Sequence, residues 1–255
     1  MKWKYLSSSV TGKSHTIRNE KGQDYCRAGI LRLPDAEVFI GLVADGAGST
    51  CCGGAGAKIT CDTLCRCIAD TIDQKHDIGL LTSKDVIRWI ECAREQIRTE
   101  AVNNGKQVRD YACTLIGAII GNHALFFQIG DGAIVIAYDD ADYETVFWPQ
   151  QGEYSNTTYF ISDDTFQNAL MVSLREIPPG KIAIFSDGLQ NLALSYPKKT
   201  VHTGFFRPMF DFLISIGDTE YTSLSSQLAD FLNCDEINER NDDDKTLILA
   251  LSSPT

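Results

Sequence analysis

The amino-acid sequence predicts an α+β fold, a single domain with a large antiparallel core and flanking helices. Short apolar runs rich in β-branched residues recur along the 255 residues and are separated by glycine-containing turns, as in antiparallel strands. Two long segments between residues 53 and 104 repeat their apolar residues at helical spacing instead. A chain of this length can bury a sizeable core, and no repeat or linker divides it. We therefore expect residues 1–255 to form one domain.

In the first half of the chain, we expect two strands followed by two helices. The runs at 25–31 and 38–44 predict strands, and apolar spacing predicts helices over 53–71 and 83–104. Ser83 is the expected N-cap of the second helix. Asn103, Asn104 and Gly105 are expected to end it, because both residue types tolerate a left-handed backbone conformation.

In the second half, the apolar period changes from helical to strand-like. Residues 113–120, 124–129 and 133–138 predict three successive strands, with turns at 121–123 and 130–132, and we expect them to form an antiparallel meander. The polar, aromatic and turn-rich segment 146–170 predicts a hairpin and a mobile connection. A strand at 181–186, helices near 204–216 and 221–233, and a last strand at 246–251 complete the set.

The composition excludes some classes of binding partner and indicates the cellular compartment of the protein. The net charge of −11 disfavours nucleic acid or an anionic membrane as the main partner. No apolar run approaches the ~20 residues that cross a bilayer, and the first ten residues lack the apolar core of a signal peptide. Cys61 and Cys65 fall within a helical pattern, Cys67 lies on another face, and no histidine is near. The nine cysteines are therefore expected to be free thiols in a reducing cytoplasm.

Acidic residues recur where apolar runs end. Three runs end in Asp-Gly, at Asp45, Asp131 and Asp187, a fourth acidic run at 242–244 precedes the last strand, and Asp24 precedes the strand at 25–31. Each Asp-Gly alone is a common turn. Together they predict several carboxylates at one end of the core, where mutual repulsion favours binding of hard divalent cations such as Mg²⁺ or Mn²⁺.

The glycine-rich stretch at 43–58 raises the alternative of a nucleotide phosphate loop. Lys58 follows Ala57 and precedes Ile59, which does not match a Walker loop, and the glycines do not match the dinucleotide fingerprint. The glycines are better explained as clearance around Asp45.

The ordered set Gln23-Asp24, VADGAGS (43–49), IGDG (129–132), FSDGL (185–189) and DDKT (243–246) resembles the metal-dependent PPM-type protein serine/threonine phosphatases, the protein phosphatase 2C family. Gly12-Lys13-Ser14-His15 resembles an element of its compact bacterial branch. The resemblance spans about 10–252. It implies a four-layer α-β-β-α sandwich with two central antiparallel sheets.

The resemblance also implies a set of metal ligands. Asp45 would bridge two cations, the Gly46 carbonyl would help hold the second, and Asp187 and Asp243 would hold the first. Asp244 is the alternative to Asp243. Asp24 would hold metal-bound water, and Asp131 matches an aspartate linked to a weaker third site in some members.

The chemistry that the resemblance implies is hydrolysis of phosphoserine and phosphothreonine in proteins by a water that two Mn²⁺ or Mg²⁺ ions activate, with no covalent intermediate. The implied partners are phosphoproteins, such as a serine/threonine kinase or its targets. Two functional alternatives stay open. One is a non-catalytic module that binds a phosphoprotein or kinase, and the other is a phosphatase for a small metabolite.

Two positions depart from the family pattern. Ala47 replaces a histidine that is a candidate general acid in many eukaryotic members, so His15 or a metal-bound water would protonate the leaving group; a structural role for His15 is equally consistent with the sequence. Asn19 stands where the family has a phosphate-gripping arginine. Arg18, one residue earlier, would serve if the chain bulges there, and is otherwise a surface arginine.

Overall fold

The computed structural model describes residues 2–34, 36–138, 142–150, 158–216 and 221–253, and it contains two five-stranded antiparallel sheets. The strands of the first sheet lie in the order β1 (Lys2–Val10), β12 (Lys245–Ser253), β9 (Lys181–Phe185), β6 (Ala133–Ala137) and β7 (Glu144–Thr145). Those of the second lie in the order β2 (Tyr25–Arg32), β3 (Glu37–Ala44), β4 (Leu115–Ile120), β5 (Ala124–Ile129) and β8 (Met171–Arg175). A small ribbon pairs β10 (Leu194–Ser195) with β11 (Thr200–Val201).

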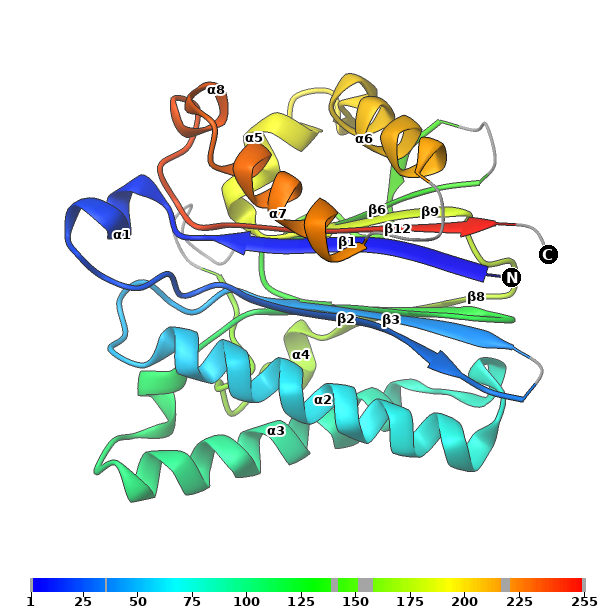
Figure 1. Ribbon diagram of the computed structural model, residues 1–255. Helices are drawn as coiled ribbons and strands as arrows, with labels where there is room; N and C mark the ends of the chain where they lie inside the picture. The colour runs from blue at the N-terminus through cyan, green and yellow to red at the C-terminus, as the bar shows by residue number, and fades with distance from the viewer. Residues whose placement is uncertain (1, 35, 139–141, 151–157, 217–220, 254–255) are drawn as a thin grey trace.

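Helices cover the outer faces of both sheets, which confirms the predicted α-β-β-α sandwich (Figure 1). The long helices α2 (Gly53–Lys75) and α3 (Ser83–Asn103) lie against the second sheet. Helices α6 (Thr203–Ser215) and α7 (Tyr221–Leu232) lie against the first. Short helices are α1 (Lys13–Ile17), α4 (Phe166–Ala169), α5 (Gln190–Ala193) and α8 (Asp235–Asn238), with 3-10 turns at Ile78–Leu80, Val108–Tyr111 and Asp187–Leu189. No helix in the described ranges is long and apolar enough to cross a membrane.

Three apolar clusters fill the spaces between these layers. The middle cluster, between the sheets, includes Phe39, Ile116, Phe126, Ile184 and Ile248. The two outer clusters pack α2 and α3 on one sheet and α6 and α7 on the other. The strands at the centre, β4, β5 and β6, are buried along their whole length and are mostly apolar, because both faces of each sheet are covered.

Most predicted elements are present, with four corrections. Thr82, not Ser83, is the N-cap of α3, where its side chain forms a capping box with Asp85. The expected three-stranded meander is wrong: β4 and β5 pair, but β6 lies in the other sheet beside β9. The chain changes sheets at Gly130, whose φ of 109° favours glycine.

The other two corrections concern β1 and the segment 146–170. β1 pairs with β12 along its whole length, so the ordered core begins before residue 10. In segment 146–170, residues 151–157 lie outside the described residues, and the described part holds α4 rather than a hairpin.

Candidate metal centre

The strand register brings the predicted acidic residues to one end of the sandwich, the left end in Figure 1. Tyr25 pairs with Ala44, so Asp24 and Asp45 are adjacent where β2 begins and β3 ends. Phe185 at the end of β9 pairs with both Leu247 and Ala133, so Asp187 lies between the start of β12 and the turn before β6. Antiparallel pairing therefore places strand ends and strand starts at the same edge.

Three of these carboxylates form one cluster. Asp45, Asp131 and Asp187 each offer an oxygen, and these oxygens lie within 4.8 Å of one another. Asp24 adjoins the cluster, because the pairing of Tyr25 with Ala44 places Asp24 beside Asp45. Within the described residues, none of these four carboxylates forms an ion pair with lysine, arginine or histidine. A partly buried acidic cluster without a basic partner is costly unless a cation binds to it.

The pKa values of the cluster reflect this cost. Burial first, and then the charges of Asp24 and Asp187, raise the pKa of Asp45 well above its usual value. Burial and the charges of Asp131 and Asp243 raise the pKa of Asp187 to about 8. Burial also raises the pKa of Asp131. Divalent cations would remove this repulsion, since oxygen ligands suit Mg²⁺ and Mn²⁺.

Asp24 is held by two hydroxyl groups, one from the residue after β9 and one from the start of β12. Its Oδ2 accepts hydrogen bonds from Ser186 Oγ at 2.6 Å and from Thr246 Oγ1 at 2.8 Å. Burial nevertheless raises its pKa to about 6. The buried Oδ1 atoms of Asp24 and Asp131 accept no hydrogen bond from the described residues, so both are available to a ligand. Ser186 and Thr246 were not predicted as site residues, although both lie within the motifs FSDGL and DDKT.

The backbone around Asp45 is fixed by hydrogen bonds to neighbouring segments. Thr114 bonds both to the Asp45 amide, through its hydroxyl at 3.0 Å, and to the Asp45 carbonyl, through its amide at 2.8 Å. The Gly46 amide donates to the carbonyl of Gln23 at 3.2 Å. No backbone hydrogen bond among the described residues ends on the Gly46 carbonyl oxygen, which fits the role of a metal ligand.

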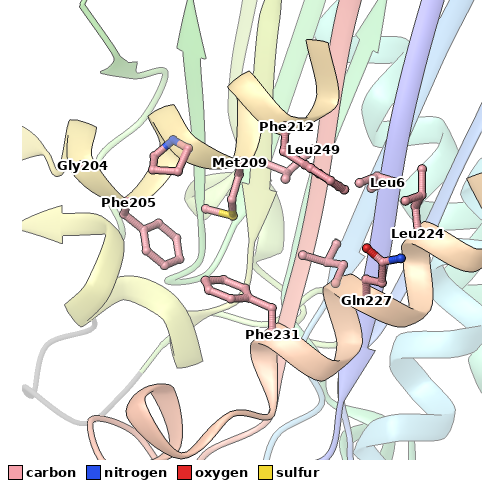
Figure 2. Close-up of a pocket in the computed structure, with 11 residues that line it drawn as sticks. Leu6, Gly204, Phe205, Met209, Phe212, Leu224, Gln227, Phe231 and Leu249 are labelled. Carbon is pink, nitrogen blue, oxygen red and sulfur yellow. The ribbon is translucent and has the colours of Figure 1, made fainter. Parts of the chain in front are cut away.

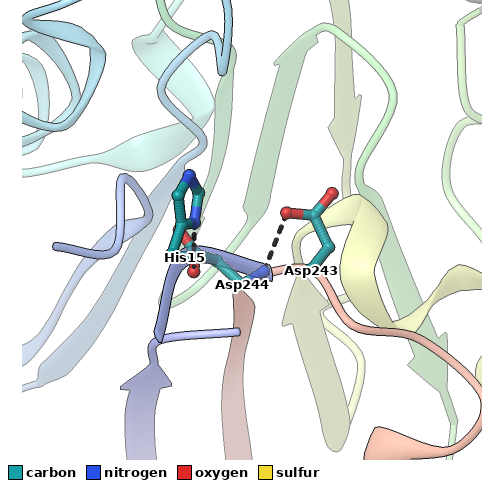
Figure 3. Close-up of side chains that lie close together, drawn as sticks. All are labelled: His15, Asp243 and Asp244. Carbon is teal, nitrogen blue, oxygen red and sulfur yellow. Dashed lines mark hydrogen bonds and ion pairs between the residues drawn. The ribbon is translucent and has the colours of Figure 1, made fainter. Parts of the chain in front are cut away.

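Asp243 and Asp244 differ sharply in their surroundings (Figure 3). Asp244 is buried, and its carboxylate accepts hydrogen bonds from the amides of Gly12 at 2.7 Å and Gln23 at 2.5 Å. It is also 2.9 Å from Nδ1 of His15. Asp243 is more open and accepts only the amide of Asp244, at 2.8 Å, among the described residues. The geometry therefore favours Asp243 as the ligand.

His15 and Arg18 come from α1 and its C-terminal end but differ in burial. The His15 ring is buried against Asp244. Arg18 is about half exposed and donates to Glu20 Oε2 at 2.7 Å. That hydrogen bond, together with the charges of Asp242 and Asp243, raises the pKa of Arg18, so the guanidinium lies near the last acidic run. Asn19 has a φ of 56°, so a left-handed residue follows Arg18, at the position where the sequence suggested a bulge.

A separate apolar cavity of about 390 Å³ lies between α6, α7 and the first sheet (Figure 2). Phe205, Met209, Phe212, Leu228 and Phe231 are among its lining residues. Among the described residues, no titratable side chain lines it. It therefore offers no groups for the chemistry that the acidic cluster suggests.

Comparison with known proteins agrees with this fold. The family model described as protein phosphatase 2C matches residues 11–233. The chain is 34% identical to serine/threonine-protein phosphatase 3 of Escherichia coli (strain K12), over 98% of this chain and 99% of that protein.

Two solved structures share the fold. One is PppA of Pseudomonas aeruginosa, a key regulatory component of T6SS, with a TM-score of 0.62 and 19% identity over 99% of both chains. The other is the serine/threonine phosphatase Stp1 of Staphylococcus aureus, with a TM-score of 0.60 and 15% identity over 100% of this chain and 96% of that one. On the extent of the family match and the full-length relative, this chain belongs to the protein phosphatase 2C family.

Proposed function

We propose that this chain is a serine/threonine-protein phosphatase that binds two divalent cations, Mn²⁺ or Mg²⁺, at the acidic cluster. The observation that carries the proposal is the set of oxygens from Asp45, Asp131 and Asp187 within 4.8 Å, with no basic partner among the described residues. The E. coli relative is named as a protein phosphatase, which supports phosphoproteins as the substrate class.

In this proposal each residue has a definite role. Asp45, Asp187, Asp243 and the Gly46 carbonyl would hold the two cations, with Asp45 as the ligand that both would share. Asp131 serves a weaker third site. When bound, the cations supply an activated water and neutralise charge on the phosphoryl oxygens, so no protein nucleophile is needed. Asp24, fixed by Ser186 and Thr246, orients water through its free Oδ1.

The residues near α1 have supporting roles in the proposal. His15 holds Asp244, and Asp244 holds the backbone of Gly12 and Gln23 in place at the edge of the site. We therefore assign His15 a positioning role rather than that of the general acid. Arg18 is the candidate for contacting the substrate phosphate, because it lies near Asp243 and is half exposed.

The proposal is tested by hydrolysis of a phosphothreonine peptide and of p-nitrophenyl phosphate, with Mn²⁺ and with excess EDTA. We expect metal-dependent activity that falls by at least ~10²-fold in Asp187→Asn. The matched control is Asp235→Asn, which removes an acid that is 87% exposed, and we expect it to stay active. No activity from folded protein with either metal would favour a non-catalytic module. Activity on p-nitrophenyl phosphate but not on phosphopeptides would favour a small-metabolite phosphatase.

We also propose that residues 1–255 form one phosphatase domain. Support comes from β1 and β12, which pair along their whole length although they lie at opposite ends of the chain. A single cooperative thermal transition is expected, and two resolved transitions would contradict this.

A further inference from the structure

Cys51 and Cys52 form a pair of adjacent thiols on the loop that follows Asp45 and Gly46. Their sulfur atoms lie 3.3 Å apart. Cys51 is exposed and Cys52 is partly buried. Cys52 is the residue that precedes α2, and its amide donates to the carbonyl of Asp110 at 3.1 Å. Nothing in the proposed phosphatase chemistry uses either thiol.

Cys26, Cys67 and Cys113 are poorer candidates for reaction than Cys51. Burial raises the pKa of Cys26 and Cys113 to about 12, and burial together with Cys92 raises the pKa of Cys67 to about 11. Protonated thiols react slowly, because the thiolate is the nucleophile. Cys92 on α3 is exposed and lies beside Cys67 on α2. These two cysteines are a second neighbouring pair, with which Cys51 and Cys52 can be compared.

We propose that Cys51 and Cys52 form a redox modification site that low-molecular-weight disulfides, such as oxidised glutathione, convert to a disulfide. Cys51 is the attacking thiol, because it is the exposed member of the pair. Cys52 is the resolving thiol, since it is less accessible and in contact with Cys51.

The reaction balances in two exchange steps. The Cys51 thiolate attacks one sulfur of oxidised glutathione, forms a mixed disulfide and releases one glutathione. The Cys52 thiolate then attacks Cys51 Sγ, which forms the Cys51–Cys52 bond and releases the second glutathione. The two protein thiols lose two electrons and two protons, and the glutathione disulfide gains them.

The product is expected to be readily reversible. Adjacent Cα atoms are about 3.8 Å apart, whereas disulfides usually join Cα atoms about 4.4–6.8 Å apart. A disulfide between neighbours is therefore strained, and strained, exposed disulfides are easily reduced. Such a bond suits reversible modification rather than permanent stabilisation.

A disulfide between Cys51 and Cys52 would also change the geometry of the metal centre through the backbone. This step rests on the proposed function. Gly53 follows Cys52 directly, and its backbone packs against Gly46: a Cβ added to Gly46 would lie 2.3 Å from the Gly53 carbonyl carbon. A strained ring at Cys51–Cys52 would shift Gly53 and thereby Gly46. A shift of about 1 Å near reacting groups can cost ~10²-fold in rate.

The chemical half of the proposal is tested by mass spectrometry in a Cys92→Ser background, which removes the comparison pair. Protein is treated with oxidised glutathione, free thiols are blocked, and tryptic peptide 33–58, which contains no other cysteine, is analysed. We expect an internal disulfide in this peptide, lost on treatment with dithiothreitol. Cys52→Ser should retain one glutathione on Cys51, whereas Cys51→Ser should retain little. Free thiols at both positions, or glutathione trapped on Cys52 instead, would overturn the proposal.

The functional half is tested by Mn²⁺ titration and by hydrolysis of p-nitrophenyl phosphate before and after oxidation. We expect at least ~10-fold lower activity and weaker Mn²⁺ binding in the oxidised protein, both restored by dithiothreitol, and no such change in Cys51→Ser. A complete disulfide with unchanged Mn²⁺ binding and activity would overturn this half. If the reduced protein has no activity at all, the proposed function fails, while the mass and Mn²⁺ results still decide the thiol site.

Discussion

Nδ1 of His15 lies 2.9 Å from Oδ1 of Asp244, and this buried pair joins α1 to the segment that precedes β12 (Figure 3). The same carboxylate accepts the amides of Gly12 and Gln23. Both of its oxygens are thereby engaged, Oδ1 by Gly12 and His15 and Oδ2 by Gln23. Asp244 therefore organises the edge of the site, and the neighbouring Asp243 is left to face a ligand.

Exchanging each of these two aspartates for asparagine should separate stability from metal binding. Asp244→Asn is expected to lower the free energy of unfolding by about 2–3 kcal/mol, because the buried amides of Gly12 and Gln23 lose a charged acceptor. Asp243→Asn is expected to change stability by less than about 0.5 kcal/mol in EDTA but to weaken Mn²⁺ binding. Urea denaturation and Mn²⁺ titration of both variants measure this. The opposite pattern would make Asp244 the ligand.

Gly46 and Gly48 offer a matched steric test within one loop. A Cβ at Gly46 would lie 2.3 Å from the carbonyl carbon of Gly53, whereas a Cβ at Gly48 would meet no atom within 4 Å. Gly46→Ala is expected to cost more than about 1 kcal/mol of stability and most of the activity, and Gly48→Ala less than about 0.5 kcal/mol. Thermal unfolding and phosphatase assays of both variants check this. Equal behaviour of the two would contradict close packing at Gly46.

The lowered pKa of Asp85 leads us to expect that the free energy of unfolding depends on pH in the acidic range. Burial opposes its charge, but hydrogen bonds from Lys75 Nζ at 2.8 Å and from the Thr82 amide at 2.8 Å hold its pKa below the usual value. A lowered pKa in the folded state stabilises the protein above the unfolded-state pKa, and this contribution is lost as the pH falls through the folded-state pKa.

Asp85→Asn should therefore cost about 1–2 kcal/mol near neutral pH. The difference from the unmutated protein should begin to shrink below about pH 4, where an unfolded-state aspartate becomes protonated, and should be lost as the pH falls through the lower folded-state pKa of Asp85. Urea denaturation over this pH range measures it. A difference that stays constant with pH would exclude the charge of Asp85 as its source.

Variants in β1 test whether this strand, which the sequence did not predict, contributes to the free energy of unfolding. Leu6 is buried in the cluster between the first sheet and its helices, while Lys2 at the strand's beginning is exposed. Leu6→Ala is expected to cost about 2–4 kcal/mol, and Lys2→Ala less than about 0.5 kcal/mol. Denaturant midpoints of the two variants provide the comparison. Equal midpoints would mean that β1 is only loosely attached.

The sequence could not predict β1 or the change of sheet at β6, for physical reasons. Only Trp3 and Leu6 of β1 are buried, so the strand lacks an apolar alternation, and its partner β12 is more than 230 residues away. A Gly-Asp-Gly turn between two apolar strands is compatible with a hairpin or with a crossing between sheets. Only the packing of β6 beside β9 distinguishes these.

The acidic cluster was more predictable, because it depends on where strands end. Asp45, Asp131 and Asp187 each follow an apolar run, and antiparallel pairing brings such ends together. The assignment between Asp243 and Asp244 depended on hydrogen bonds to Gly12 and Gln23, more than 200 residues earlier in the chain. No local pattern encodes those contacts. The same holds for the hydroxyl groups of Ser186 and Thr246. Their hydrogen bonds to Asp24 join residues far apart in the sequence, so only the folded structure identifies them.

The most direct test of the metal centre is a Mn²⁺ titration followed by electron paramagnetic resonance, which detects binding independently of any substrate. We expect the unmutated chain to bind two Mn²⁺ ions at micromolar to millimolar concentrations. Asp45→Asn, which removes the shared ligand, should lose at least one of them. Asp235→Asn should bind as the unmutated chain does. Absence of saturable binding, or full binding by Asp45→Asn, would contradict a two-cation centre at this cluster.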